Sequence, residues 1–138
     1  MFIIAIMEKI LQYLKKYCSF LYSRYNFQMV ESDCSESFGN ALVILESGNL
    51  RLQFIKDRDQ LFLDFQPTSN KKEWFSIDIV KQLITGNIET SAQMNSDKAE
   101  FLKIHLDEIN DLFSPTNFES TFKKLKELER ARAKRLFG

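Results

Sequence analysis

Between Asn26 and Gln66 the pattern of apolar residues takes a period of two, and short polar or charged pairs interrupt it at two tight turns. A period of two is typical of strands that place one face on a core, and tight turns join antiparallel neighbours. With Gly48-Asn49 as the first turn, three pairs face each other: Leu45 with Leu52, Val43 with Phe54, and Glu46 with Arg51. Because the last pair joins opposite charges, it supports this register.

A second turn at Arg58-Asp59 continues the same apolar face. It places Phe54 opposite Leu63 and Leu52 opposite Phe65. The pattern therefore predicts three strands, at Ala41–Glu46, Leu50–Lys56 and Gln60–Gln66, and a fourth strand around Phe27–Asp33 at one edge.

Helical periodicity flanks the predicted strands. Apolar residues at helical spacing predict a first helix from Ile10 to about Arg24. After the strands, Ser76 is a suitable N-cap for a short helix that ends at Gly86. Between these two predicted helices, the spacing of the apolar residues changes from a period of 3.6 to a period of two.

Two capping-box patterns predict the last two helices. Asp97 with Glu100 precedes one apolar stripe, Thr116 with Glu119 precedes the other, and Pro115 separates them. At 138 residues the chain has the length of one domain, covering 1–138. The predicted fold is α+β: a three- or four-stranded antiparallel meander, with one long helix before it and three helices after it.

The outer face of the predicted sheet is too apolar to be simply solvated. It carries Leu42, Ile44, Ile55 and Phe62 beside Arg51, Gln53 and Asp64. Because domains stack their elements in layers, we expect the first or the last helix to cover this face. The alternative is a patch that binds a partner.

Charge is unevenly distributed although it sums to zero. Residues 1–30 carry a net charge of +3, residues 31–117 carry −7, and residues 118–138 carry +4. Two interpretations follow: the basic ends dock on the acidic middle, or the middle presents an acidic surface to a basic partner. The basic run at 123–135 is interrupted by glutamates and lacks an aromatic RNA-binding pattern on the strands, which disfavours nucleic acid.

Several chemistries lack their sequence signatures. Cys18 and Cys34 belong to no CxxC or Cys/His cluster, so we expect free thiols and a reducing, cytoplasmic environment. His105 is the only histidine, which disfavours a zinc site. Four scattered glycines form no phosphate-binding loop, so no nucleotide cofactor is expected. The N-terminal apolar run is too short for a membrane anchor and lacks the basic start of a secretory signal.

Three aspartates invite a metal-dependent alternative. Asp57, Asp59 and Asp64 lie on or beside one predicted hairpin, and neighbouring carboxylates can hold magnesium. The register weakens this hypothesis, because Asp57 and Asp59 flank a turn where aspartate is favoured for backbone reasons.

The stretch from Leu50 to Gln66 (LRLQFIKDRDQLFLDFQ), followed by residues 73–80 (EWFSIDIV) and Gly86, resembles small bacterial proteins, some of which are similar to immunity proteins of polymorphic toxin systems. The resemblance covers residues 50–86 and not the terminal helices. It implies a cytosolic protein that binds and occludes a toxin, with no catalysis of its own.

Together these observations predict a protein-binding module without enzymatic activity, cofactor or metal. We expect an immunity-like inhibitor that binds a basic protein partner, such as a basic toxin, through an acidic sheet and hairpin surface. The alternatives are a metal-dependent hydrolase acting on nucleic acid and a homodimer built through the apolar sheet face. The predicted contact residues are Arg51, Gln53, Asp57, Arg58, Asp59, Phe62 and Asp64.

Overall fold

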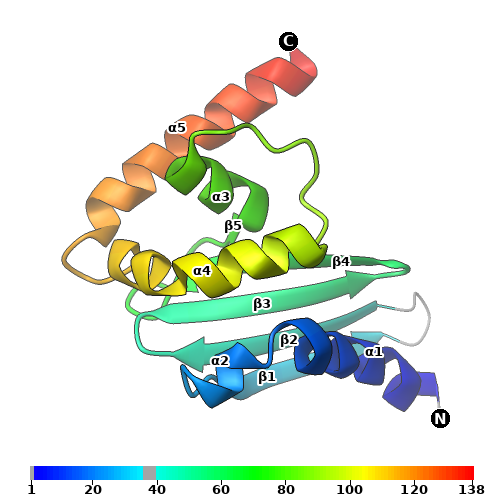
Figure 1. The fold of residues 1–138 in the computed structure, drawn as a ribbon. Coiled ribbons are helices and arrows are strands. Elements are labelled where there is room, and N and C mark those ends of the chain that lie inside the picture. The colour runs from blue at the N-terminus through cyan, green and yellow to red at the C-terminus, as the bar shows by residue number, and fades with distance from the viewer. Residues whose placement is uncertain (1, 36–39) are drawn as a thin grey trace.

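A computed structural model describes residues 2–35 and 40–138, which form an α+β fold (Figure 1). In chain order the elements are α1 (Phe2–Tyr17), α2 (Phe20–Ser23), β1 (Gln28–Ser35), β2 (Asn40–Ser47), β3 (Leu50–Asp57), β4 (Gln60–Pro67), β5 (Phe75–Ser76), α3 (Ile77–Thr85), α4 (Ser96–Leu112) and α5 (Phe118–Phe137).

The strands form one antiparallel sheet in the order β1-β2-β3-β4-β5. The predicted register is confirmed at its five diagnostic pairs: Val43 with Phe54, Leu45 with Leu52, Glu46 with Arg51, Phe54 with Leu63, and Leu52 with Phe65. The predicted edge strand is also present as β1, with a register shift between Met29 and Glu31. One apolar face per strand was sufficient to define this alignment.

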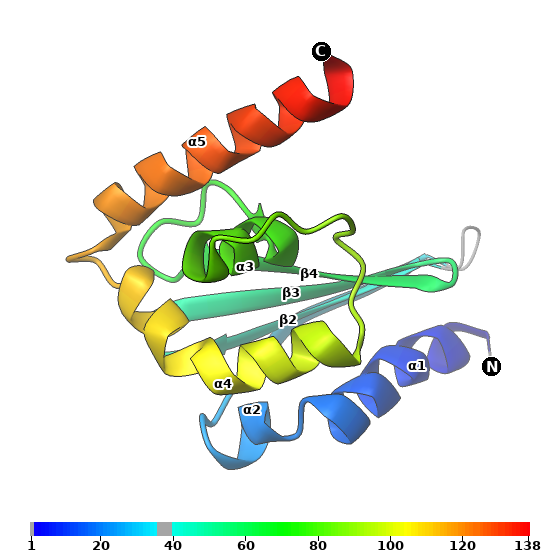
Figure 2. The same cartoon turned by 45° about the horizontal axis from the view of Figure 1, so that its top comes forward.

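The core lies on one face of the sheet, which we call the inner face. Its residues Val43, Leu45, Leu52, Phe54, Leu63 and Phe65 are fully buried. They share one core cluster with Ile10 and Leu14 of α1 and with Leu102 and Leu106 of α4. Helices α1, α2 and α4 all lie on this side of the sheet in both ribbon views (Figure 2).

Helix α4 is fixed to the β2–β3 turn by one asparagine. The backbone N–H of Asn49 donates to Oδ1 of Asn110 at 3.0 Å, and Nδ2 of Asn49 donates to the Asn110 carbonyl at 3.3 Å. Gly48 precedes Asn49 with φ +57°, and a Cβ there would lie 3.2 Å from Asn110 Oδ1. The turn therefore needs glycine both for its backbone conformation and for the approach of α4.

Helices α3 and α5 lie beyond the β5 edge of the sheet (Figure 1). Phe75 of β5 contacts Phe118 and Phe122 of α5 edge to face, with ring centroids 6.3 and 6.0 Å apart. Arg132 adds a polar tie, since its guanidinium donates to Oδ2 of Asp78 at 2.8 Å and to Oγ of Ser76 at 3.2 Å. A cation in the second half of α5 thus docks on the acidic middle of the chain, as one interpretation of the charge distribution predicted.

The first helix is not continuous, in contrast to our prediction. It ends at Tyr17, and a short second helix starts at Phe20. Cys18 at the break and Leu21 just after it are fully buried, and Phe20 is 6% exposed. The break keeps both segments turned toward the core, and a stripe with helical spacing does not reveal such a break because its apolar positions are unchanged.

Two predicted helix starts and one strand also needed correction. Helix α4 is capped by Asn95, whose Oδ1 accepts from the Lys98 N–H at 2.9 Å, two residues before the predicted Asp97. Helix α5 begins after Asn117, whose amide instead donates to the Asp111 carbonyl at 2.9 Å. The fifth strand, β5, has only two residues, too few to show an alternating pattern.

The outer face of the sheet is not covered by the first or the last helix. Helix α1 packs on the inner face, and α5 packs at the β5 edge. Among the described elements, no helix lies against the outer face in either view (Figures 1 and 2). The layer expected there is therefore missing from the described chain. None of the described helices combines the length and apolar character that a membrane span requires.

We expect Arg132→Met to lower the free energy of unfolding by about 2 kcal/mol, because it leaves the carboxylate of Asp78 buried without its cation. The Asp78 side chain is only 7% exposed. Urea unfolding followed by circular dichroism measures the change. The double variant Asp78→Asn/Arg132→Met should recover most of the loss, and Arg130→Met, at an exposed site on the same helix, is the control. An equal loss in the single and the double variant would contradict this account.

Candidate functional site

The outer face, which we call the open face, presents its side chains in rows that run across the strands. The register places these residues on it: Gln28, Glu31 and Asp33 of β1; Leu42, Ile44 and Glu46 of β2; Arg51, Gln53, Ile55 and Asp57 of β3; and Gln60, Phe62, Asp64 and Gln66 of β4. Alternation along each strand puts every second residue here, opposite to the buried core.

One row of the open face is mostly apolar. Leu42, Ile55 and Phe62 lie side by side on three neighbouring strands, with Asp33 at the β1 end of the row. All three apolar side chains are only partly buried. Each therefore keeps surface that a partner can cover, and the exposed Asp33 places a negative charge beside them.

The open face is acidic. Five of its residues are carboxylates and one is a cation: Glu31, Asp33, Glu46, Asp57 and Asp64 against Arg51. Glu31, Asp33 and Asp57 are exposed. A negative potential over a partly apolar surface favours approach by a basic partner.

The segment after β4 covers one end of the open face. Nζ of Lys71 lies 4.0 Å from the Glu46 carboxylate, which also pairs with Arg51 at 3.5 Å. The Arg51 guanidinium lies over the Trp74 ring, 5.7 Å from its centroid. Arg51 is thus held between a strand and this segment, and its side chain is only 13% exposed. The part of the open face that remains accessible to a partner therefore lies nearer the apolar row.

Gln53 and Asp64 form a polar pair in the middle of the face. Nε2 of Gln53 donates to Oδ2 of Asp64 at 3.2 Å, and Gln53 is itself buried. Burial raises the pKa of Asp64 above its ordinary value, and the nearby charge of Asp78 raises it further. The hydrogen bond from Gln53 acts in the opposite direction. Gln53 and Asp64 therefore form a fixed, largely buried part of the open face and offer little surface for contact with a partner.

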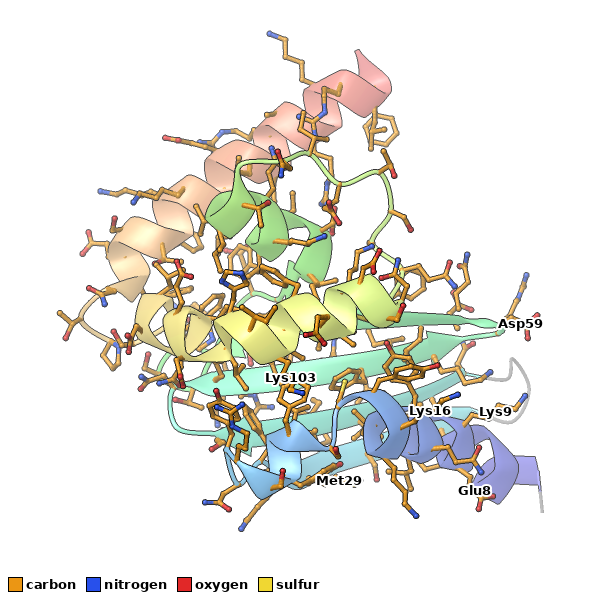
Figure 3. All side chains as sticks on the ribbon, viewed as in Figure 1. Glu8, Lys9, Lys16, Met29, Asp59 and Lys103 are labelled. Carbon is orange, nitrogen blue, oxygen red and sulfur yellow. The ribbon has the colours of Figure 1, made fainter. Side chains whose placement is uncertain are left out.

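The β3–β4 hairpin tip carries the other predicted residues. Asp57, Arg58 and Asp59 are exposed there, and Asp59 stands at the end of the hairpin (Figure 3). Arg58 has φ +57°, and its carbonyl accepts a hydrogen bond from Nζ of Lys56. The structure therefore separates the seven predicted residues into a group on the open face (Arg51, Gln53, Asp57, Phe62, Asp64) and a pair in the turn (Arg58, Asp59).

Sequence reasoning missed the contribution of β1 to this surface. Glu31 and Asp33 extend the acidic face over the edge strand, opposite Ile44 and Leu42. Their i, i+2 spacing within the predicted edge strand Phe27–Asp33 was the available signal, because residues two apart in a strand share a face. The register shift at Met29 obscured which face that was.

Other chemistry-bearing side chains have structural surroundings. Cys18 is buried, and burial raises the pKa of its thiol to about 12. The His105 ring stacks on Phe101 with centroids 4.8 Å apart, and its Nδ1 lies 3.1 Å from Glu108 Oε1. Within residues 2–35 and 40–138, no group of three or more His, Cys, Asp or Glu side chains is arranged to hold a metal ion.

No protein-family model, curated protein sequence or solved structure matches the chain.

We expect Asp64→Asn to raise the melting temperature at neutral pH, because it removes a carboxylate whose charged form is disfavoured in the folded protein. A raised pKa means that the folded state holds its proton more tightly than the unfolded state does. The penalty is therefore fully present above the folded-state pKa and disappears below the ordinary carboxyl range. Thermal unfolding between about pH 7 and about pH 3.5 should show the gain shrink as pH falls.

The matched control is Asp59→Asn at the exposed hairpin tip, for which we expect little change at either pH. A lower melting temperature of the Asp64→Asn variant at neutral pH would show that the charged carboxylate stabilises the fold, contrary to this prediction.

Proposed function

We propose that this chain is a non-enzymatic protein-binding module, an immunity-like inhibitor that binds a basic protein partner through the open face and the adjoining β3–β4 hairpin. The observation that carries the proposal is a sheet face that no described helix covers and that combines an apolar row with an excess of carboxylates.

The apolar row supports a macromolecular partner. Interfaces between proteins place apolar side chains at the centre and polar ones at the rim. Here Leu42, Ile55 and Phe62 lie between the polar row of Gln53 and Asp64 and the row of Asp57 and Gln60. Covering these half-buried side chains provides the favourable burial of apolar surface, at roughly 25 cal/mol per Å².

The charges support a basic partner over a second copy. In a two-fold dimer through this face, the carboxylates of one copy would meet those of the other. Like charges brought together at an interface are destabilising. A basic partner gains instead from electrostatic steering, which speeds association most at low salt.

The fixed side chains of Arg51 and Gln53 support binding without large rearrangement of the open face. Arg51 is fixed by Glu46 and Trp74, and Gln53 is fixed on Asp64. Side chains that are ordered before binding lose less conformational entropy when the partner arrives. In this proposal the exposed Asp33 and Asp57 make the charged contacts, and Phe62 provides apolar contact.

We expect the double variant Asp33→Lys/Asp57→Lys to lose the partner that the unmodified protein binds, with affinity at least tenfold lower, because it reverses both exposed charges that flank the apolar row. The measurement is affinity capture from the native lysate at about 0.05 M and about 0.5 M salt, followed by titration of the captured protein. A stoichiometric basic protein, held more weakly at high salt, is the expected result.

The control is Glu100→Lys/Asp111→Lys, which changes the net charge equally at two exposed positions of α4. Equal loss in both variants would indicate an effect of net charge alone. Equal retention in both, or recovery of nucleic acid in place of a protein, would overturn the proposed site.

A further inference from the structure

A hollow of about 550 Å³ lies between the second half of α5 and the loop that joins α3 to α4. In Figure 1 this loop rises from α3 toward the second half of α5 before it descends to α4. Cavities that bind small molecules have volumes of roughly 300 to 1,000 Å³, so this hollow is large enough for such a ligand. None of its wall residues belongs to the open face.

Three large apolar side chains of the wall are exposed to solvent. Ile88 in the loop is 55% exposed, and Leu136 and Phe137 at the end of α5 are 66% and 86% exposed. Single exposed apolar residues are ordinary on a protein surface, whereas three that line one cavity form a patch. A ligand with an apolar part gains favourable burial by covering them.

The two carboxylates in the wall are already neutralised by cations. Oδ2 of Asp78 accepts a hydrogen bond from Arg132 at 2.8 Å, while Oδ1 of Asp78 is itself buried. The carboxylate of Glu89 pairs with Nζ of Lys81 at 3.0 Å and lies 3.9 Å from Nζ of Lys98. Three cations thus match two carboxylates, and the surroundings of the hollow favour an anion.

Arg135 is a further cation in the wall, and it is accessible to a ligand. Its side chain is exposed, and its guanidinium forms no ion pair or hydrogen bond within residues 2–35 and 40–138. A guanidinium binds a carboxylate through two parallel N–H donors. The hollow therefore places a carboxylate-binding group beside an apolar patch.

We propose that the hollow binds a small molecule that carries one carboxylate on an apolar body, with the carboxylate on Arg135 and the body against Ile88, Leu136 and Phe137. The guanidinium selects the charge of the ligand, and the apolar side chains make the affinity depend on the length of its apolar part. This inference goes beyond the proposed function and does not rest on it, because the hollow and the open face share no residue.

The probes are octanoate, octanol, octylammonium and acetate, which separate the contribution of the charge from that of the chain. Backbone amide shifts of the protein, measured by nuclear magnetic resonance, report where each probe binds and how tightly. We expect octanoate to give saturable shifts in the amides of Glu89, Thr90 and Arg135, with an affinity at least about tenfold higher than that of acetate. Octanol should bind more weakly than octanoate, and octylammonium should be the weakest of the three long-chain probes.

Substitutions in the wall test the two parts of the site separately. Arg135→Gln should weaken octanoate binding at least about fivefold and leave octanol binding unchanged, which also shows that the hollow is intact in the variant. Phe137→Ser should weaken both probes. The matched control is Arg130→Gln, which removes an exposed arginine of the same helix outside the wall and should change neither.

Equal affinities for octanoate and octanol, or unchanged octanoate binding by Arg135→Gln, would overturn recognition of the carboxylate. Tighter binding of octylammonium would show that Asp78 and Glu89 select the charge, contrary to the inference. Absence of saturable shifts at the hollow with every probe would overturn the site itself. Sedimentation of the protein with phosphatidylglycerol vesicles, abolished by Phe137→Ser, would assign the apolar patch to a membrane surface and overturn the inference. The lysate capture tests the open face independently of these results.

Discussion

The burial of a single sheet face is the constraint on which the other elements depend. Six inner-face residues on β2, β3 and β4 are fully buried, and α1 and α4 are ordered by packing against them. Because side chains alternate along a strand, a shift of one residue would move this whole set to the opposite face. The large loss of burial that such a shift entails keeps the strands in one alignment. That alignment decides which residues lie on the open face, and packing on the open face itself does not.

The polar contacts at the β5 edge have a different role, since they fix the helices that follow the sheet. Phe75 provides the apolar contact to α5, while Lys126 and Arg132 pair with Glu73 and Asp78. The hydrogen bond that Nζ of Lys126 donates to the Glu73 carboxylate is the main cause of the raised pKa of Lys126. These pairs neutralise part of the acidic middle of the chain at the edge. Glu31 and Asp33 of the open face lie on β1, at the opposite edge of the sheet from these pairs.

Sequence patterns predicted the sheet well because its determinants are local. The turns at Gly48 and Arg58 and the alternation beside them define every pair from β2 to β4. The break at Cys18 and the two-residue strand β5 arise from tertiary packing, and neither changes the local periodicity. The candidate site was predicted in part for the same reason: its residues on β3 and β4 follow from the register, whereas the contribution of β1 depended on a shift at Met29.

The uncovered outer layer was the least predictable feature from sequence. Apolar residues on both faces of a strand ordinarily indicate that both faces are covered. Here Ile44 is 4% exposed without belonging to the core cluster. Its neighbours in the row, Gln53 and Glu31, have long side chains whose aliphatic portions can shield it. A strand face can thus hold a buried isoleucine where no described helix covers it, and composition does not distinguish this arrangement from a covering helix.

The order of the strands in the sheet follows their order in the chain, and this has a consequence for folding kinetics. Each strand pairs only with the strand before it and the strand after it. Contacts between residues close in sequence require little loop closure, so the chain loses little entropy before the first favourable contacts form. The meander can therefore grow hairpin by hairpin, and the slow step becomes the docking of α1 and α4, which must reach the inner face from opposite ends of the sequence. Mutations in the turns should then alter the folding rate, and mutations in the helices should mainly alter the unfolding rate.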